Sequence, residues 1–192
     1  LGGMAGLSAE GGAIYNCVNR GAARGYQACA GIAGLCMDTD IAACFNYGAV
    51  RAERVWGGGI VGFFERYGAA RRLIAGCVNH GCVTAADFAG GIAAHAEEAA
   101  GDAGALLAVA QKDRAEKGVA SGGGMHLTAC LNFGAVETTS QESAMGTGGI
   151  AGTNVFYLSR CVNLGAVSSR GAFAGGIAGR NFGDAAECVN FG

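Results

Sequence analysis

Two short motifs alternate along the whole chain, and this alternation restricts the fold more than any other feature. The first motif is Gly-Gly-Ile-Ala-Gly or a close variant, as at residues 58–62, and the second is Cys-x-Asn-x-Gly, as at 77–81. Each motif occurs six times, and the cysteines of the second are 27, 33, 53, 31 and 27 residues apart. A unit of about 27 residues with occasional insertions is typical of a solenoid, in which each unit forms one coil stacked on its neighbours.

Composition excludes several other classes. The 192 residues include 37 glycines and no proline, 51% are apolar and 15% are charged. Glycine has no three-residue period, which excludes collagen, and the apolar fraction is too high for a disordered segment. No apolar run reaches the roughly 18 residues of a membrane-spanning helix. The net charge of −2 gives no basic footprint for nucleic acid.

The units are too rich in glycine for paired helices, so we expect strands. Valine, isoleucine and phenylalanine favour strands, while glycine and asparagine tolerate the positive φ that tight corners require. The sequence therefore predicts an all-β fold, a parallel β-solenoid of about six coils forming a single domain over 1–192. A right-handed winding is expected from the handedness of parallel crossovers.

One segment interrupts the regular spacing of the motifs. Residues 95–124 lengthen one unit, and the stretch 105–117 consists of helix-forming residues. This pattern predicts a short helical insertion at about 95–124. Two interpretations stay open for it, a tolerated loop insertion or a dedicated binding element.

Stacking places equivalent residues above one another in columns. Neighbouring Cβ atoms in such a column are about 4.8 Å apart, beyond the roughly 3.5–4.5 Å of a disulfide, so the cysteine column is interpreted as small buried thiols. An asparagine column can bond to its own turn and to the amides above and below. Whether the off-column Cys29 and Cys36 pair stays open. The two structural columns are Cys17, Cys44, Cys77, Cys130, Cys161 and Cys188, and Asn19, Asn46, Asn79, Asn132, Asn163 and Asn190.

The residue after each cysteine is apolar, and the third residue after it is mostly apolar or aromatic, with Arg20 and His80 as the polar members. If the cysteines point inward, strand alternation sends both sets outward, and an outward apolar stripe usually marks a partner surface. The alternative is that the corner turns one set into the core. The candidate partner surface comprises Phe45, Tyr47, Phe133, Leu164 and Phe191, together with Phe63, Phe64 and Tyr67 of a lesser insertion.

No catalytic or metal-binding motif is found. The three histidines are scattered, there is no Cys-x-x-Cys pair, and the carboxylates do not recur at one position. We therefore expect no enzyme activity, no cofactor and no metal. The alternative is a carbohydrate-acting β-helix enzyme, which would need three or more of its acids around one groove. The candidate acids are Asp38, Asp40, Glu53, Glu65 and Asp87.

Gly-Gly-Ile-Ala-Gly followed by Ile-x-x-Cys-x-Asn-x-Gly-x-Val resembles the GLUG repeat of bacterial surface proteins, which also occurs beside IgA-specific metallopeptidases. The resemblance covers nearly all of the chain except 95–124, although Ala94 replaces one closing glycine. It implies a cell-surface or secreted location. The zinc motif His-Glu-x-x-His of those peptidases is absent, so no protease activity is implied.

These observations predict a non-catalytic repeat module that acts in adhesion or binding, or as a rigid spacer. A self-assembling surface fibre is a further alternative. The expected partners are flanking domains or repeats of the same polypeptide and a host protein or glycan, with no nucleic acid and no membrane span. Both ends of the chain fall inside a motif without a polar capping unit, from which we expect a piece of a longer array.

Overall fold

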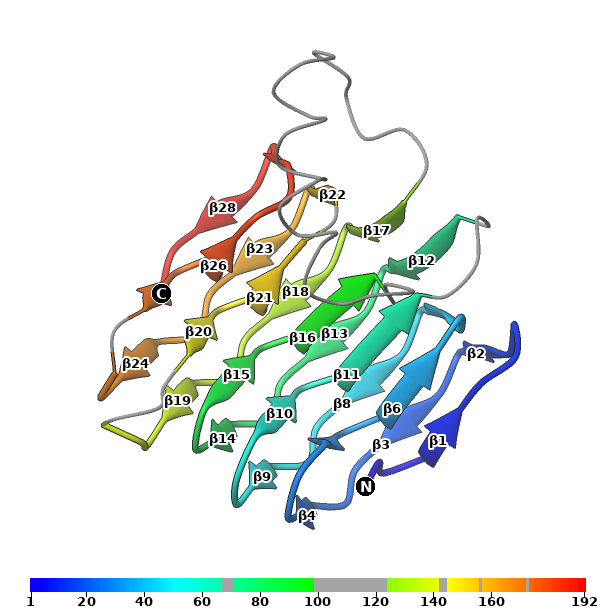
Figure 1. Ribbon diagram of the computed structural model, residues 1–192, viewed down its shortest axis with the longest axis horizontal. Helices are drawn as coiled ribbons and strands as arrows, with labels where there is room; N and C mark the ends of the chain where they lie inside the picture. Colours follow the sequence, from blue (N-terminus) through cyan, green and yellow to red (C-terminus); the bar gives the residue numbers. More distant parts are fainter. Residues whose placement is uncertain (67–70, 99–123, 142–144, 156, 172) are drawn as a thin grey trace.

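The computed structural model describes residues 1–66, 71–98, 124–141, 145–155, 157–171 and 173–192. It confirms the predicted fold class. The described residues form short parallel strands stacked in about five turns of a β-solenoid, without a helix (Figure 1). None of them forms a helix long and apolar enough to cross a membrane.

Each complete coil contributes five strands. The first coil has β1 (Ala5–Ser8), β2 (Ala13–Tyr15), β3 (Val18–Asn19), β4 (Ala23–Gly25) and β5 (Cys29–Ala30). The second has β6 (Ala33–Met37), β7 (Asp40–Ala42), β8 (Phe45–Asn46), β9 (Val50–Ala52) and β10 (Trp56–Gly58). The third has β11 (Val61–Arg66), β12 (Arg72–Ala75), β13 (Val78–Asn79), β14 (Val83–Ala85) and β15 (Phe88–Gly90).

The later coils repeat this order. The fourth has β16 (Ala93–Glu98), β17 (Met125–Thr128), β18 (Leu131–Asn132), β19 (Val136–Thr138) and β20 (Gly146–Gly148). The fifth has β21 (Ala151–Asn154), β22 (Tyr157–Ser159), β23 (Val162–Asn163), β24 (Val167–Ser169) and β25 (Ala174–Gly175). Three strands of a sixth follow, namely β26 (Ala178–Asn181), β27 (Ala185–Ala186) and β28 (Val189–Asn190).

Equivalent strands of successive coils pair in five parallel sheets. Sheet I contains β1, β6, β11, β16, β21 and β26, sheet II contains β2, β7, β12, β17, β22 and β27, and sheet III contains β3, β8, β13, β18, β23 and β28. Sheet IV contains β4, β9, β14, β19 and β24, and sheet V contains β5, β10, β15, β20 and β25. The pairing keeps the motifs in register, so that Asn79 lies between Asn46 and Asn132.

The interior is divided into two cores. The larger core contains the isoleucines of the glycine motif, the inward residues of sheet II and the cysteine column, represented by Ile60, Ile74 and Cys77. The smaller core is built from valine, alanine and Cys29, as at Val83 and Ala89. The smaller core holds only side chains up to the size of valine, whereas the larger core also holds isoleucine, leucine, Met125 and Phe64.

The asparagine column meets the second glycine of each Gly-Gly-Ile-Ala-Gly motif across the coil. A Cβ added to Gly59 would lie 2.4 Å from Cγ of Asn79, and one added to Gly91 would lie 2.3 Å from Cγ of Asn132. No other residue fits in this space, since even a methyl group would overlap the amide. The two motifs are therefore the two halves of one contact, which explains why they alternate strictly.

Each interior asparagine makes a closed set of hydrogen bonds. Nδ2 of Asn79 donates to the carbonyl of Gly81 and to Oδ1 of Asn132, both at 2.8 Å. Its Oδ1 accepts from the backbone N–H of Gly81 at 3.2 Å and from Nδ2 of Asn46 at 2.8 Å. Asn79 is fully buried, so these bonds satisfy an amide that would otherwise be costly to remove from water.

The corners differ from the expectation about positive φ. The glycine of Cys-x-Asn-x-Gly is required by close approach instead, because a Cβ on Gly81 would lie 2.0 Å from the carbonyl oxygen of Gly48. Positive φ occurs at the residue before each cysteine, where φ is between 51° and 59°. This column contains a single glycine and consists of Asn16, Ala43, Gly76, Ala129, Arg160 and Glu187.

The boundary of the insertion also needs correction. Residues 95–98 continue β16, and His95 and Ala96 pair in register with Phe63 and Phe64 of β11. The strand extends here because its backbone is hydrogen-bonded to the preceding coil. The helix predicted at 105–117 lies outside the described residues.

We predict that Asn79→Ala lowers the free energy of unfolding by at least about 3 kcal/mol. The substitution leaves buried partners on Gly81, Asn46 and Asn132 unsatisfied, at about 1–3 kcal/mol each. Asn190→Ala is the matched control, since Asn190 is exposed, and a loss of about 1 kcal/mol is expected there. Urea unfolding followed by circular dichroism measures both. Equal losses would show that the buried ladder does not hold the coils together.

The positive-φ column gives a second prediction. Gly76→Ala should destabilise the protein by about 1 kcal/mol, and Ala129→Gly should stabilise it by up to about 1 kcal/mol, because an L-residue is strained in this region. Both positions are exposed, and a Cβ on Gly76 meets nothing within 4 Å, so the change is confined to the backbone. Thermal unfolding measures the two opposite shifts, and shifts of the same sign would contradict the assignment.

Candidate functional site

The outer face of sheet III carries two outward columns. The valine column, one residue after each cysteine, consists of Val18, Phe45, Val78, Leu131, Val162 and Val189. The ring column, three residues after each cysteine, consists of Arg20, Tyr47, His80, Phe133, Leu164 and Phe191. Strand alternation produces this arrangement, because the cysteine and the asparagine of the same motif point inward.

Neither column contributes side chains to the two cores. The corner therefore does not turn one of the two sets inward. Every member of the ring column is exposed, with Tyr47 at 46%, Phe133 at 44% and Phe191 at 74%. The valine column is half-buried in the middle coils, where Phe45 lies. The result is a largely apolar strip along the axis of the solenoid, with Arg20 and His80 as its polar members.

Three consecutive rings of the ring column are stacked face to face. The ring centroids of Tyr47 and His80 are 4.8 Å apart with planes inclined by 3°, and those of His80 and Phe133 are 4.6 Å apart with planes inclined by 7°. The guanidinium of Arg20 lies 5.4 Å from the Tyr47 centroid, which extends the stack by a cation–π contact. Parallel register fixes this geometry, since the ring spacing equals the strand spacing of about 4.8 Å.

Two aromatic residues of the predicted partner surface, Phe63 and Phe64, are placed differently. Phe64 is fully buried in the larger core, where it shares a register position with Cys36. Phe63 points to the other side of β11 but is only 8% exposed, because its ring packs against Trp56 at 4.6 Å between centroids. Both are therefore packing residues rather than contact residues. Tyr67 lies outside the described residues.

Phe63 belongs to an aromatic cluster that the sequence analysis did not identify. His95 of β16 lies above it with centroids 5.4 Å apart, and Phe88 of β15 meets His95 edge-on at 5.1 Å. Trp56 and Phe88 are register partners on sheet V, as are Phe63 and His95 on sheet I. The sequence does contain a signal for this cluster. Trp56 and Phe63 are seven residues apart, and Phe88 and His95 repeat this spacing at the equivalent positions of the next unit.

The cysteine column is a column of free thiols. All nine cysteines are unpaired, and the interior members of the column donate Sγ–H to the carbonyl two residues earlier, at 3.2–3.4 Å. Burial raises the pKa of Cys130 well above its usual range and that of Cys36 to about 12. Cys29 and Cys36 lie in different cores and do not pair.

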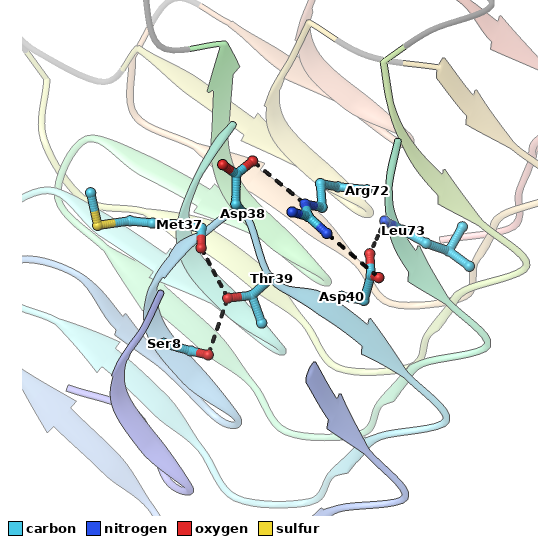
Figure 2. Close-up of polar contacts among 7 residues, drawn as sticks. All are labelled: Ser8, Met37, Asp38, Thr39, Asp40, Arg72 and Leu73. Carbon is cyan, nitrogen blue, oxygen red and sulfur yellow. Dashed lines mark hydrogen bonds and ion pairs between the residues drawn. The ribbon is translucent and has the colours of Figure 1, made fainter. Parts of the chain in front are cut away.

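Two of the candidate acids meet at one arginine (Figure 2). Nε of Arg72 lies 3.5 Å from Oδ1 of Asp38, and its Nη1 lies 4.0 Å from Oδ2 of Asp40. Oδ1 of Asp40 also accepts the backbone N–H of Leu73 at 2.9 Å. Figure 2 shows this cluster bridging the ends of β6, β7 and β12, beside the hydrogen bond from Thr39 to Ser8. Both carboxylates are paired with Arg72, and Asp40 is also bonded to the backbone, which suits a structural role.

Of the other candidate acids, Glu65 lies next to this cluster, because its backbone carbonyl accepts the N–H of Asp38 at 2.9 Å, whereas Glu53 and Asp87 lie beside other sheets. Glu53 follows β9 and forms an exposed ion pair with Arg24 at 2.7 Å, beside sheet IV at the opposite edge of the ribbon from β12 (Figure 1). Asp87 precedes β15, and Glu65 is the register partner of Met37 on sheet I. Among the described residues, no group of three or more histidine, cysteine or carboxylate side chains is arranged to hold a metal ion.

No family model, curated protein or solved structure matches this chain.

We predict that Cys82 is the cysteine that reacts fastest in the folded protein, because it is the exposed one of the nine. Iodoacetamide labelling followed by peptide mass spectrometry should give near-complete modification of Cys82 while the fully buried thiols stay unmodified. All nine should react in concentrated urea without a reducing agent. Modification of Cys77 or Cys130 at the rate of Cys82 in the folded state would contradict the buried column.

Proposed function

We propose that this chain is a non-catalytic binding module of a bacterial cell-surface or secreted protein, and that the ring column is its contact surface. The observation that carries the proposal is the exposed line of large apolar side chains on sheet III, from Tyr47 through Phe133 to Phe191. Six strands at about 4.8 Å spacing give this surface a length of about 24 Å. Contiguous exposed apolar surface of this kind marks interaction sites.

The stacking suits recognition of a large, extended partner. The rings are held by their neighbours and by the strands beneath them, so little side-chain freedom is lost when a partner binds. A host protein or a glycan can lie along such a strip, with aromatic edges and the imidazole of His80 offering apolar and polar contacts. The resemblance to GLUG repeats supports the location and suggests flanking domains or repeats of the same polypeptide as further neighbours.

A rigid spacer is the second candidate, favoured by the asparagine ladder. The ladder runs without a break from Asn19 to Asn190, so every coil is hydrogen-bonded to the next through side chains as well as backbone. Such an object resists bending along its axis. The enzyme alternative gains no support from Asp38 and Asp40, whose carboxylates are both occupied by Arg72.

A binding screen separates these functions. Wild-type protein and the double variant Tyr47→Ser/Phe133→Ser are compared on glycan arrays and on host extracellular proteins, with Tyr15→Ser as the matched control, since Tyr15 is an exposed tyrosine on sheet II. We expect one class of partner to bind wild type and the control and to lose at least tenfold in affinity with the double variant. The double variant and the control should both unfold near the wild-type temperature, because the three side chains that they replace are exposed.

A deletion tests the insertion in the same screen. The structure places its ends at Glu98 and Met125, so residues 99–123 are replaced by a short glycine linker that leaves β16 and β17 intact. Binding that survives the deletion but not the ring substitutions supports the ring column. Absence of binding by wild type to every partner class would favour the spacer.

A further inference from the structure

An open depression lies on the outer face of sheet II, away from the ring column. It has a volume of about 270 Å³ and is lined by Arg71, His126, Thr128, Tyr157, Ser159, Arg160 and Glu187. All of its lining side chains are polar or aromatic. They come from β17, β22 and the turns that follow or precede the strands of sheet II.

The register of the coils explains how these residues meet. The outward position of sheet II holds Asp40 and Leu73 in the second and third coils, then His126 and Tyr157 in the fourth and fifth. The next outward position changes from alanine at Ala75 to hydroxyl groups at Thr128 and Ser159. No core contact requires these changes, since the positions face outward. The departures from the repeat therefore gather hydrogen-bonding side chains at one place.

The depression carries a net positive charge. Two arginines line it against one glutamate, which leaves a formal charge of +1. Nε of Arg160 donates to Oε2 of Glu187 at 2.7 Å, but both side chains are about 70% exposed, and an exposed ion pair of this kind opens at little cost. Arg71 is exposed at the edge of the depression beside His126.

The hydrogen-bonding groups are suited to a ligand with several oxygen atoms. The hydroxyls of Thr128 and Ser159 lie 2.9 Å apart and each keeps further bonding capacity. The rings of His126 and Tyr157 are 5.2 Å apart and tilted by 53°. Nε2 of His126 is buried and has no hydrogen-bond partner within the described part of the chain.

We propose that this depression binds an oxyanion group, a carboxylate or a sulfate, carried free or by an acidic saccharide. Arg71 and Arg160 supply the charge-assisted hydrogen bonds, and the hydroxyls of Thr128, Tyr157 and Ser159 supply neutral ones. The site is independent of the proposed function, because it lies on a different sheet and shares no residue with the ring column.

His126 provides a local reporter for this site. Burial, and secondarily the charge of Arg71, lower the pKa of His126 below its usual value. The other titratable groups around it are Tyr157 on β22 and Arg160 and Glu187 at the rim of the depression. A bound oxyanion offsets the charge of Arg71, so it raises the pKa of His126. The chain has only two other histidines, His80 and His95, which serve as internal controls.

The test is a titration followed by the histidine ring resonances in NMR. Sodium sulfate is added to the full chain, with sodium chloride at the same ionic strength as the reference. We expect a saturable shift of His126 and a rise in its pKa, with His80 and His95 unchanged. Arg71→Ala should weaken binding about tenfold, the loss expected for one charge-assisted hydrogen bond. Arg24→Ala is the matched control, because Arg24 is likewise an exposed arginine but lies outside the site, and this variant should bind sulfate like wild type.

Further arms of the titration identify the source of the oxyanion. Glucuronate that binds more tightly than sulfate indicates an acidic saccharide, and equal binding indicates recognition of the oxyanion alone. The double variant Tyr47→Ser/Phe133→Ser should bind sulfate normally, so failure of the ring column and failure of this site are distinguishable. Equal shifts of all three histidines, unchanged affinity in Arg71→Ala, or a response to glucose equal to that to glucuronate would overturn the proposal.

Discussion

The contact between the asparagine column and the glycine of the opposite wall determines the cross-section of the solenoid. Each amide lies where the two walls approach so closely that a methyl group would overlap it, as at Gly59 and Asn79. The same amide bonds to its own turn and to the amides above and below. One side chain therefore sets the width of the coil, closes the turn and fixes the register between coils. The smaller core is filled with alanine, valine and Cys29, whereas the larger core accommodates isoleucine, leucine and Phe64.

Much of this architecture could be predicted from the sequence. Strict alternation of two motifs at about 27 residues predicts stacked coils, and the parallel β-solenoid is confirmed. Asparagine and cysteine at fixed positions imply columns, and alternation along a strand places Tyr47 and Phe133 on the opposite side from Asn46 and Asn132. These inferences need only the repeat length and the two-residue period of a strand.

Other features depend on distances between the walls of a coil, which a sequence does not contain. Glycine in Asn-x-Gly suggests positive φ, but Gly81 is required by the carbonyl of Gly48, and the strained φ belongs to residues as different as Ala43 and Arg160. Phe63 and Phe64 resemble an exposed aromatic pair in the sequence, yet one fills the larger core and the other is covered by Trp56. The inward position of Phe64 follows from its register with Cys36, and Cys36 lies outside both motifs. The repeat pattern therefore does not reveal it.

The division between inward and outward positions has a functional consequence. Inward residues are constrained at every coil, since a change at Asn79 or Gly59 alters the spacing of the whole stack. Outward residues are free of this constraint, and the chain varies there, from Arg20 to Phe191 on sheet III and from Asp40 to Tyr157 on sheet II. A binding surface in such a protein arises from side chains of several coils brought into line by the register. Any specificity therefore depends on which coils carry the departures from the repeat, and a surface could be changed by substitution on one sheet without loss of the fold.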